Sequence, residues 1–179
     1  MSPATSEQAT EASQPSKSRA LGVVYLLYFL TAIFSVAIAS KPQLAFAFNV
    51  ISLAFYVAVT ILFYRLFTPV HQGFSLLAAL VSLAGCTVQA LGLFQPHSAA
   101  AKISPLALFG PYCILVGFLI LKSILLPRFL GALMVLAGVG WLLVLIPAVR
   151  KHLLGPAEAL GFLAELFLCL WLLVKGAKL

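Results

Sequence analysis

Six long apolar stretches, separated by short polar breaks, follow the first nineteen residues of the chain. Each stretch has about 17 to 24 residues, enough for a helix to cross a hydrocarbon core of roughly 30 Å. Only a helix satisfies every backbone polar group within one such segment. The pattern therefore predicts an all-α, polytopic membrane bundle of six transmembrane helices with short loops. Their expected ranges are Ala20–Ala39, Leu44–Phe67, Gly73–Phe94, Pro105–Leu121, Phe129–Val149 and Ala157–Val174.

The breaks between the stretches contain residues that end or begin helices. They read SKP at 40–42, TPVHQ at 68–72, QPHS at 95–98, LPR at 126–128 and RKHLLGP at 150–156. Proline removes a backbone donor and restricts the residue before it, so it favours helix boundaries. Because every connection is short, neighbouring helices are expected to run antiparallel.

The first nineteen residues, MSPATSEQATEASQPSKSR, differ in composition from the rest of the chain. They are rich in Ser, Thr, Ala, Pro and Glu, and no bulky apolar residue follows Met1. Such a segment cannot bury a core. We therefore expect a disordered N-terminal tail over 1–19 and a six-helix transmembrane domain over 20–179.

The overall composition narrows the class of protein and its partners. The chain is 63% hydrophobic and 8% charged, whereas a soluble domain has roughly 25% charged residues. The lipid bilayer is therefore the expected partner, with another membrane protein or a second copy of the chain as further candidates. The net charge of +7 does not indicate nucleic-acid binding, because the basic residues are scattered and form no patch.

The distribution of Lys and Arg predicts an orientation, because basic residues are enriched in cytoplasmic loops. With both termini inside, seven of the eleven basic residues are cytoplasmic and four are outside. We therefore expect a multi-pass protein of the cell (inner) membrane with cytoplasmic N- and C-termini. The inner residues are Lys17, Arg19, Arg65, Lys122, Arg128, Lys175 and Lys178, and the outer ones are Lys41, Lys102, Arg150 and Lys151.

Several polar residues fall within the apolar stretches, about 8 to 12 Å from the predicted outer ends at a rise of 1.5 Å per residue. This common depth predicts a polar pocket in the outer half of the bundle. Its candidate ligand-binding residues are Glu165, Asn49, Ser52, Gln89 and Tyr112. Small and polar residues also serve as packing contacts between membrane helices, and this alternative stays open for Asn49, Ser52 and Gln89.

Glu165 is harder to explain by packing, because an acidic residue in mid-helix costs about 2.5–3.5 kcal/mol to insert. No Lys or Arg lies at a comparable depth. The carboxyl must therefore be protonated, or accept hydrogen bonds from Asn49, Gln89 or Tyr112. Ionisable residues inside membrane segments usually mark functional sites.

Recognisable catalytic and cofactor motifs are missing from the sequence. There is no Asp, no HExxH, no GxGxxG and no P-loop. Cys86, Cys113 and Cys169 each lie inside an apolar stretch without a CxxC spacing, so neither a disulfide framework nor a metal site is expected. We expect no enzyme activity, no metal and no cofactor.

Three segments resemble a known family. SILLPRFLGALMVLAGVGWLL (123–143), ELFLCLWLLVKG (165–176) and SRALGVVYLLYFLTAIFS (18–35), which contains R-x-x-G-x-x-Y-L, carry the similarity. Together they resemble domain-of-unknown-function family 4386. The resemblance implies a bacterial multi-pass membrane protein and aligns Glu165 with an acidic position in the family's last helix. It implies no activity.

Two functions follow from these observations. The first is a structural or accessory membrane subunit, favoured by the short loops and the lack of catalytic motifs. The alternative is binding or transport of a small molecule or proton through the polar pocket around Glu165. Apart from function, the seven-residue spacing of Gly131 and Gly138 predicts a close approach of the fifth helix to a neighbour.

Overall fold

The computed structural model describes residues 3–97 and 103–177, with side chains from Ser18 onward. The described chain consists of helices joined by short connections, so the predicted all-α class is confirmed. The helices are α1 (Pro3–Ala37), α2 (Pro42–Phe67), α3 (Gln72–Phe94), α4 (Leu106–Lys122), α5 (Arg128–Val144) and α6 (Pro147–Val174).

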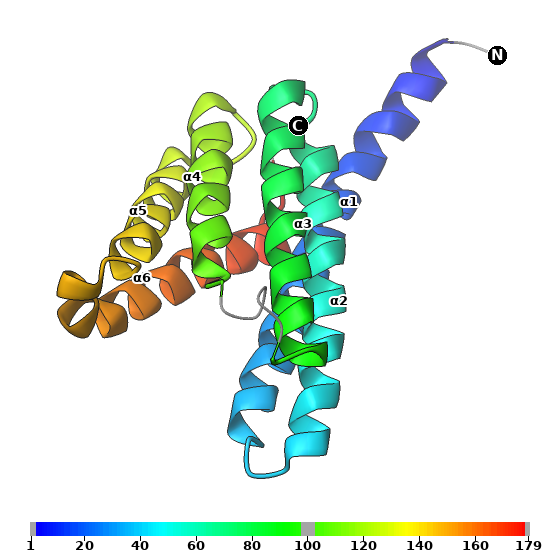
Figure 1. Cartoon of the computed structure of the whole chain (residues 1–179). Helices are drawn as coiled ribbons and strands as arrows, with labels where there is room; N and C mark the ends of the chain where they lie inside the picture. The colour runs from blue at the N-terminus through cyan, green and yellow to red at the C-terminus, as the bar shows by residue number, and fades with distance from the viewer. Residues whose placement is uncertain (1–2, 98–102, 178–179) are drawn as a thin grey trace.

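The helices form a ring in which each one packs against the next and α6 returns to α1. In Figure 1, α1, α2 and α3 run alongside one another, while α4 and α5 form a second pair. Helix α6 runs across the bundle from the end of α5 towards α1. The two ends of the helical domain therefore meet, and Ser18 Oγ accepts a hydrogen bond of 3.0 Å from the Ala177 backbone N–H.

Several helix ends follow from single residues. Pro42 and Pro147 occupy the first turns of α2 and α6, where a missing N–H costs nothing. The His71 side chain accepts a hydrogen bond from the Phe74 N–H and caps the start of α3. Gly176 follows α6 with a φ of 70°, a left-handed conformation that glycine adopts readily.

Four of the described helices contain segments long and apolar enough to cross a membrane: Ser18–Ala37 of α1, and the whole of α2, α3 and α6. Helices α4 and α5 are also apolar, but each has 17 residues. A helix of this length spans about 25 Å, less than a typical hydrocarbon core of roughly 30 Å. The structure thus indicates a membrane protein, and six crossings stay a prediction.

The last turn differs from its predicted position. Helix α5 ends at Val144 and α6 begins at Pro147, so residues 150–156 belong to a helix and not to a break. The apolar pattern continues through the true turn at 145–146, so hydropathy alone gives no signal there. Pro147 at the start of α6 is the local signal that decides the boundary.

The predicted N-terminal tail is drawn as helix from Pro3 onward, continuous with the apolar part of α1. This first part of α1 projects away from the other helices in Figure 1. Its Ala, Glu and Gln residues have good helix propensity, and extending an existing helix needs no new nucleus. The composition of residues 3–19 therefore predicts disorder, whereas their backbone is helical. The division into a tail and a helical domain stays a prediction.

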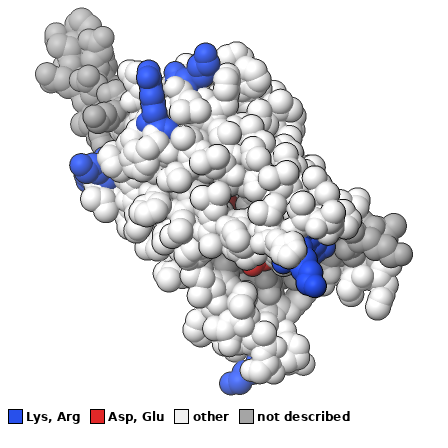
Figure 2. Space-filling model, turned by 90° about the vertical axis from the view of Figure 1, so that its left-hand side faces the viewer, with Lys and Arg blue, Asp and Glu red and all other residues white. Residues whose placement is uncertain are grey.

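The described outer surface is predominantly apolar along the helices. Large apolar side chains are exposed on all six, including Val36, Leu121 and Val174. Figure 2 shows Lys and Arg towards the edges of the view, with a surface almost free of charged residues between them. A surface of this kind is suited to contact with lipid.

Helices α4 and α5 pack through two pairs of glycines. A Cβ added to Gly138 would lie 2.5 Å from the Gly110 oxygen, and one added to Gly117 would lie 2.6 Å from the Gly131 oxygen. Glycines permit such close backbone contact between membrane helices. The prediction that Gly131 and Gly138 are close-approach positions is confirmed.

Candidate functional site

The single carboxylate in the middle of α6 is hydrogen-bonded to α1. The Tyr25 hydroxyl donates to Glu165 Oε2 at 3.0 Å. Tyr25 is buried, whereas Glu165 is half-buried. In the view of Figure 2, acidic residues show only as small areas among uncharged residues. The Glu165 side chain is therefore held by a polar partner and does not extend freely into lipid.

Close packing of α1 on α6 explains how Tyr25 reaches Glu165. A Cβ added to Gly22 would lie 2.6 Å from the Leu173 backbone nitrogen. The Cys169 thiol donates to the Gly22 carbonyl oxygen at 3.6 Å. Gly22 and Tyr25 are three residues apart, so they share one face of α1. The glycine contact thus brings the backbones together, and Tyr25 faces α6 beside it.

Three further tyrosines surround this pair, and together with Tyr25 they form what we call the tyrosine cluster: Tyr25, Tyr28, Tyr56 and Tyr112. Ring centroids are 6.0 Å apart for Tyr25 and Tyr28, and 4.8 Å apart for Tyr28 and Tyr56. The Tyr56 and Tyr112 centroids are 6.2 Å apart. Helices α1, α2, α4 and α6 therefore contribute to one polar aromatic centre.

Several polar atoms of this centre have no hydrogen-bond partner among the described residues. In the described part of the chain, no buried side-chain nitrogen or oxygen lacks a hydrogen-bond partner. The hydroxyls of Tyr28, Tyr56 and Tyr112 take part in no hydrogen bond there. These three oxygens are consequently not sealed by protein atoms, and the same holds for Glu165 Oε1. Four oxygen atoms of the centre thus have unfilled hydrogen-bonding positions.

No counter-charge accompanies Glu165 among the described residues. None of their Lys, Arg or His side chains forms an ion pair with it. The described residues also contain no group of three His, Cys, Asp or Glu side chains that could hold a metal ion. The centre therefore offers one carboxyl, four phenols and aromatic rings, without a second charged group.

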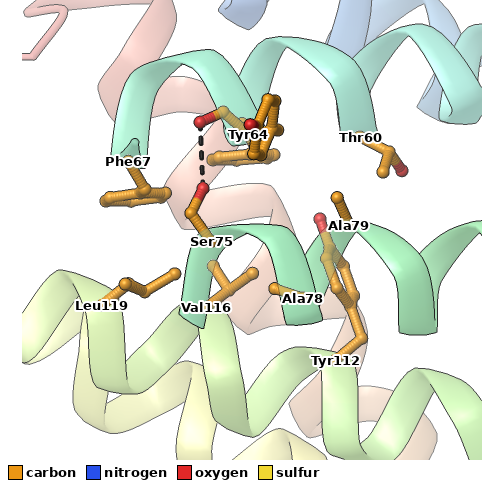
Figure 3. Close-up of a pocket in the computed structure, with 10 residues that line it drawn as sticks. Thr60, Tyr64, Phe67, Ser75, Ala78, Ala79, Tyr112, Val116 and Leu119 are labelled. Atoms are coloured by element: carbon orange, nitrogen blue, oxygen red, sulfur yellow. Dashed lines mark hydrogen bonds between the residues drawn. The ribbon is translucent and has the colours of Figure 1, made fainter. Parts of the chain in front are cut away.

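Tyr112 also contributes to a cleft between α2, α3 and α4 (Figure 3), where its ring rises from α4 towards Ala79 and Thr60. The volume enclosed in this cleft is about 10 Å³. Ser75 Oγ donates to the Tyr64 backbone oxygen at 2.9 Å on its wall. This volume is about the minimum that one water molecule needs, so the cleft is too small for an organic ligand, and Glu165 is not among the residues that line it.

Comparison with known proteins gives the family. Residues 90–176 match the family described as Domain of unknown function (DUF4386). An uncharacterized protein of Archaeoglobus fulgidus is 33% identical over 130 residues, which cover 69% of this chain and 78% of the relative. The chain belongs to the DUF4386 family. No solved structure matches it, and the predicted bacterial origin stays a prediction.

The two terminal segments that carry the resemblance to DUF4386 proteins contact each other. Gly22 and Tyr25 lie in the first of these segments, and Leu173 and Glu165 lie in the last. The matched range 90–176 contains Glu165 but not its partner Tyr25. Each terminal segment therefore supplies one half of the same helix contact.

The remaining candidates divide between local and interhelical roles. Asn49 Nδ2 donates to the Ala45 backbone oxygen at 2.8 Å, and Asn49 Oδ1 accepts from Ser35 Oγ at 3.5 Å. Ser52 is buried and Gln89 is half-buried. In the described part of the chain, the donor to Glu165 is Tyr25, and not Asn49, Gln89 or Tyr112. Of those three expected donors, Tyr112 belongs to the tyrosine cluster.

The predicted depth of Glu165 relied on a helix that starts at Ala157 and runs along the bundle. The observed α6 starts at Pro147 and runs across it. Counting residues from the helix end therefore does not give the depth of Glu165. Tyr25 and Tyr28 were missed because tyrosines near a helix end resemble the aromatic belt at membrane surfaces. Their i, i+3 spacing on one helix face was the available signal.

Proposed function

We propose that the protein is a six-span protein of the cell membrane with both termini in the cytoplasm. Support comes from the four long apolar helices, the apolar surface and the contact of Ser18 with Ala177, which is consistent with an even number of crossings. Helices α4 and α5 cross despite their length, because a bilayer thins locally around short helices at modest cost.

We further propose that the bundle binds a small ligand or proton at Glu165, within the tyrosine cluster. The single observation that carries this proposal is the half-satisfied carboxyl. Oε2 accepts from Tyr25, whereas Oε1 and three neighbouring phenols have no hydrogen-bond partner among the described residues. A carboxyl used only for packing would be expected to have its acceptors filled by protein. This open arrangement supports a site that exchanges a ligand or proton.

A second candidate function is a structural or accessory membrane subunit. The same Tyr25–Glu165 hydrogen bond favours it, because the bond links the first and last helices of the ring. In this role, the carboxyl would act as an interhelical contact of about 0.6 kcal/mol. The apolar surface would then meet a membrane-protein partner or a second copy.

Glu165→Gln separates the two functions, because glutamine keeps an acceptor for Tyr25 and removes the ionisable group. Purified protein in detergent would be screened by thermal shift against a mixed set of small acids, amines and neutral compounds. The binding function requires at least one compound that stabilises the wild type but not Glu165→Gln. Glu158→Gln is the control, since Glu158 is exposed on the same helix. If every compound affects the three proteins equally, the ligand-binding function is wrong and the structural role remains.

A further inference from the structure

We propose that the Glu165 site takes a small organic cation, either a protonated amine or a quaternary ammonium. This inference rests on the proposed ligand-binding function and specifies its ligand class. The observation behind it is the combination of one uncompensated carboxyl with four aromatic rings in the interior of the helix ring.

The charge of the site selects a cation. Glu165 supplies the only acidic group that the described part of α6 places near the tyrosine cluster, and no described Lys, Arg or His pairs with it. A negative charge in apolar surroundings is costly unless a positive charge or several donors accompany it. The ionised site therefore favours a positively charged ligand and disfavours an anionic one.

The aromatic rings select an organic cation. Tyr28 and Tyr56 are in ring contact, and Tyr56 is also in ring contact with Tyr112. The faces of tyrosine rings attract ammonium groups, and groups of aromatic side chains recognise quaternary ammonium ligands. Phenol oxygens with unfilled acceptor positions can additionally accept from an amine N–H.

The same composition disfavours a metal ion. Calcium takes six to eight oxygen ligands and magnesium needs near-octahedral geometry, whereas this centre has a single carboxyl. Softer metals prefer thiolate or imidazole sets, and the described residues contain no such group. An organic ammonium needs fewer directional contacts, because its charge is spread over alkyl groups that pack on aromatic faces.

The available space limits the ligand to a small one. Three of the four tyrosines are almost fully buried, with 2% exposure for Tyr25, 5% for Tyr56 and 3% for Tyr112. Side chains packed this closely exclude a drug-sized ligand, which needs a pocket of roughly 300–1,000 Å³. A cation of few heavy atoms is therefore the size class that we propose.

The test uses matched probes on the full-length protein in detergent or nanodiscs. Choline chloride and methylammonium chloride are the cations, and 3,3-dimethyl-1-butanol is the neutral carbon isostere of choline. Sodium chloride at equal concentration controls for ionic strength. We expect a cation to raise the melting temperature of the wild type by about 5–10 °C at 100 times its Kd. Neither the alcohol nor sodium chloride should match this effect.

Variants distinguish charge from ring contributions. Glu165→Gln should abolish the stabilisation by the cation, whereas Glu158→Gln should keep it. Tyr28→Phe retains the ring and should bind the cation with nearly unchanged Kd, while Tyr28→Leu should raise Kd about tenfold. The unliganded melting temperature of each variant shows that it is folded.

Three results bear on the proposal differently. A cation effect that requires Glu165 and the Tyr28 ring supports it. If the neutral alcohol stabilises the wild type as well as choline, and Glu165→Gln loses both effects, the cation class is wrong while the binding site stands. If neither cation has an effect that depends on Glu165, the cation proposal is overturned. The ligand-binding function then depends on the wider compound screen.

Discussion

The carbonyl oxygen of Gly110 on α4 lies 2.5 Å from the position that a Cβ on Gly138 of α5 would occupy. Seven residues along each helix, Gly117 and Gly131 repeat this contact. The numbering runs in opposite directions along the two helices, as expected for an antiparallel pair. The contact depends on backbone atoms, so a neighbouring side chain cannot move aside to accommodate a methyl group.

Gly138→Ala should therefore destabilise the protein. Separating α4 from α5 costs about 1–3 kcal/mol, the usual range for overpacking. The melting temperature in detergent measures the effect. Gly92→Ala is the matched control, because a Cβ there meets nothing within 4 Å and alanine improves helix propensity. Equal melting temperatures for the two variants would contradict the close contact.

Tyr25→Phe should lower stability through loss of the hydrogen bond to Glu165. Interhelical hydrogen bonds in membranes contribute about 0.6 kcal/mol on average and up to about 1.7 kcal/mol. Tyr28→Phe is the control, since the Tyr28 hydroxyl donates no hydrogen bond within the described structure. Thermal unfolding of the two variants measures the difference. A Tyr28 variant that is as destabilised as the Tyr25 variant would argue against a specific Tyr25–Glu165 bond.

Ser82→Ala should weaken the contact between α2 and α3. Thr60 Oγ1 and Ser82 Oγ are 2.7 Å apart and buried, so the substitution removes an interhelical hydrogen bond of about 0.6 kcal/mol. Thr87→Ala on the same helix is the comparison, because Thr87 is exposed and bonds only to its own helix at Leu83. A larger loss of stability for Thr87→Ala would refute the interhelical role of Ser82.

The proposed orientation predicts which turns face outward. A cysteine replacing Ser40 between α1 and α2 should react with an impermeant thiol reagent in intact cells. One replacing Pro69 between α2 and α3 should react only after the cells are opened. Both positions are exposed, and the native cysteines Cys86, Cys113 and Cys169 are buried, so background labelling should be low. Reversed labelling would place the termini outside.

The sequence predicted most helix boundaries because proline and glycine mark them clearly. Pro42 and Pro127 lie beside the starts of α2 and α5, close to the expected positions. The boundary between α5 and α6 was misplaced because Leu145 and Ile146 form an apolar turn. Hydropathy distinguishes polar from apolar residues, and it gives no information about a turn made of apolar residues.

The candidate site was predicted only in part, for geometric reasons. Glu165 was identified because a carboxylate is rare within an apolar helix. Its partner Tyr25 was not, because the pairing depends on how α6 crosses α1, and the crossing direction is set by packing at Gly22 and Leu173. Estimates of depth along separate helices contain no information about such a crossing. Residues on one helix face could be grouped from sequence, whereas contacts between distant helices could not.

The meeting of α1 and α6 has a consequence for how the protein is made. Tyr25 is synthesised early and Glu165 comes 140 residues later. Contacts so distant in the chain close late during folding. Until α6 has been made, helices α1 to α5 can therefore form only an open arc, with Gly22 and Tyr25 unpaired on one edge. A ribosome that stalls before Pro147 would leave that edge without the helix that completes the ring, exposed to other proteins in the membrane.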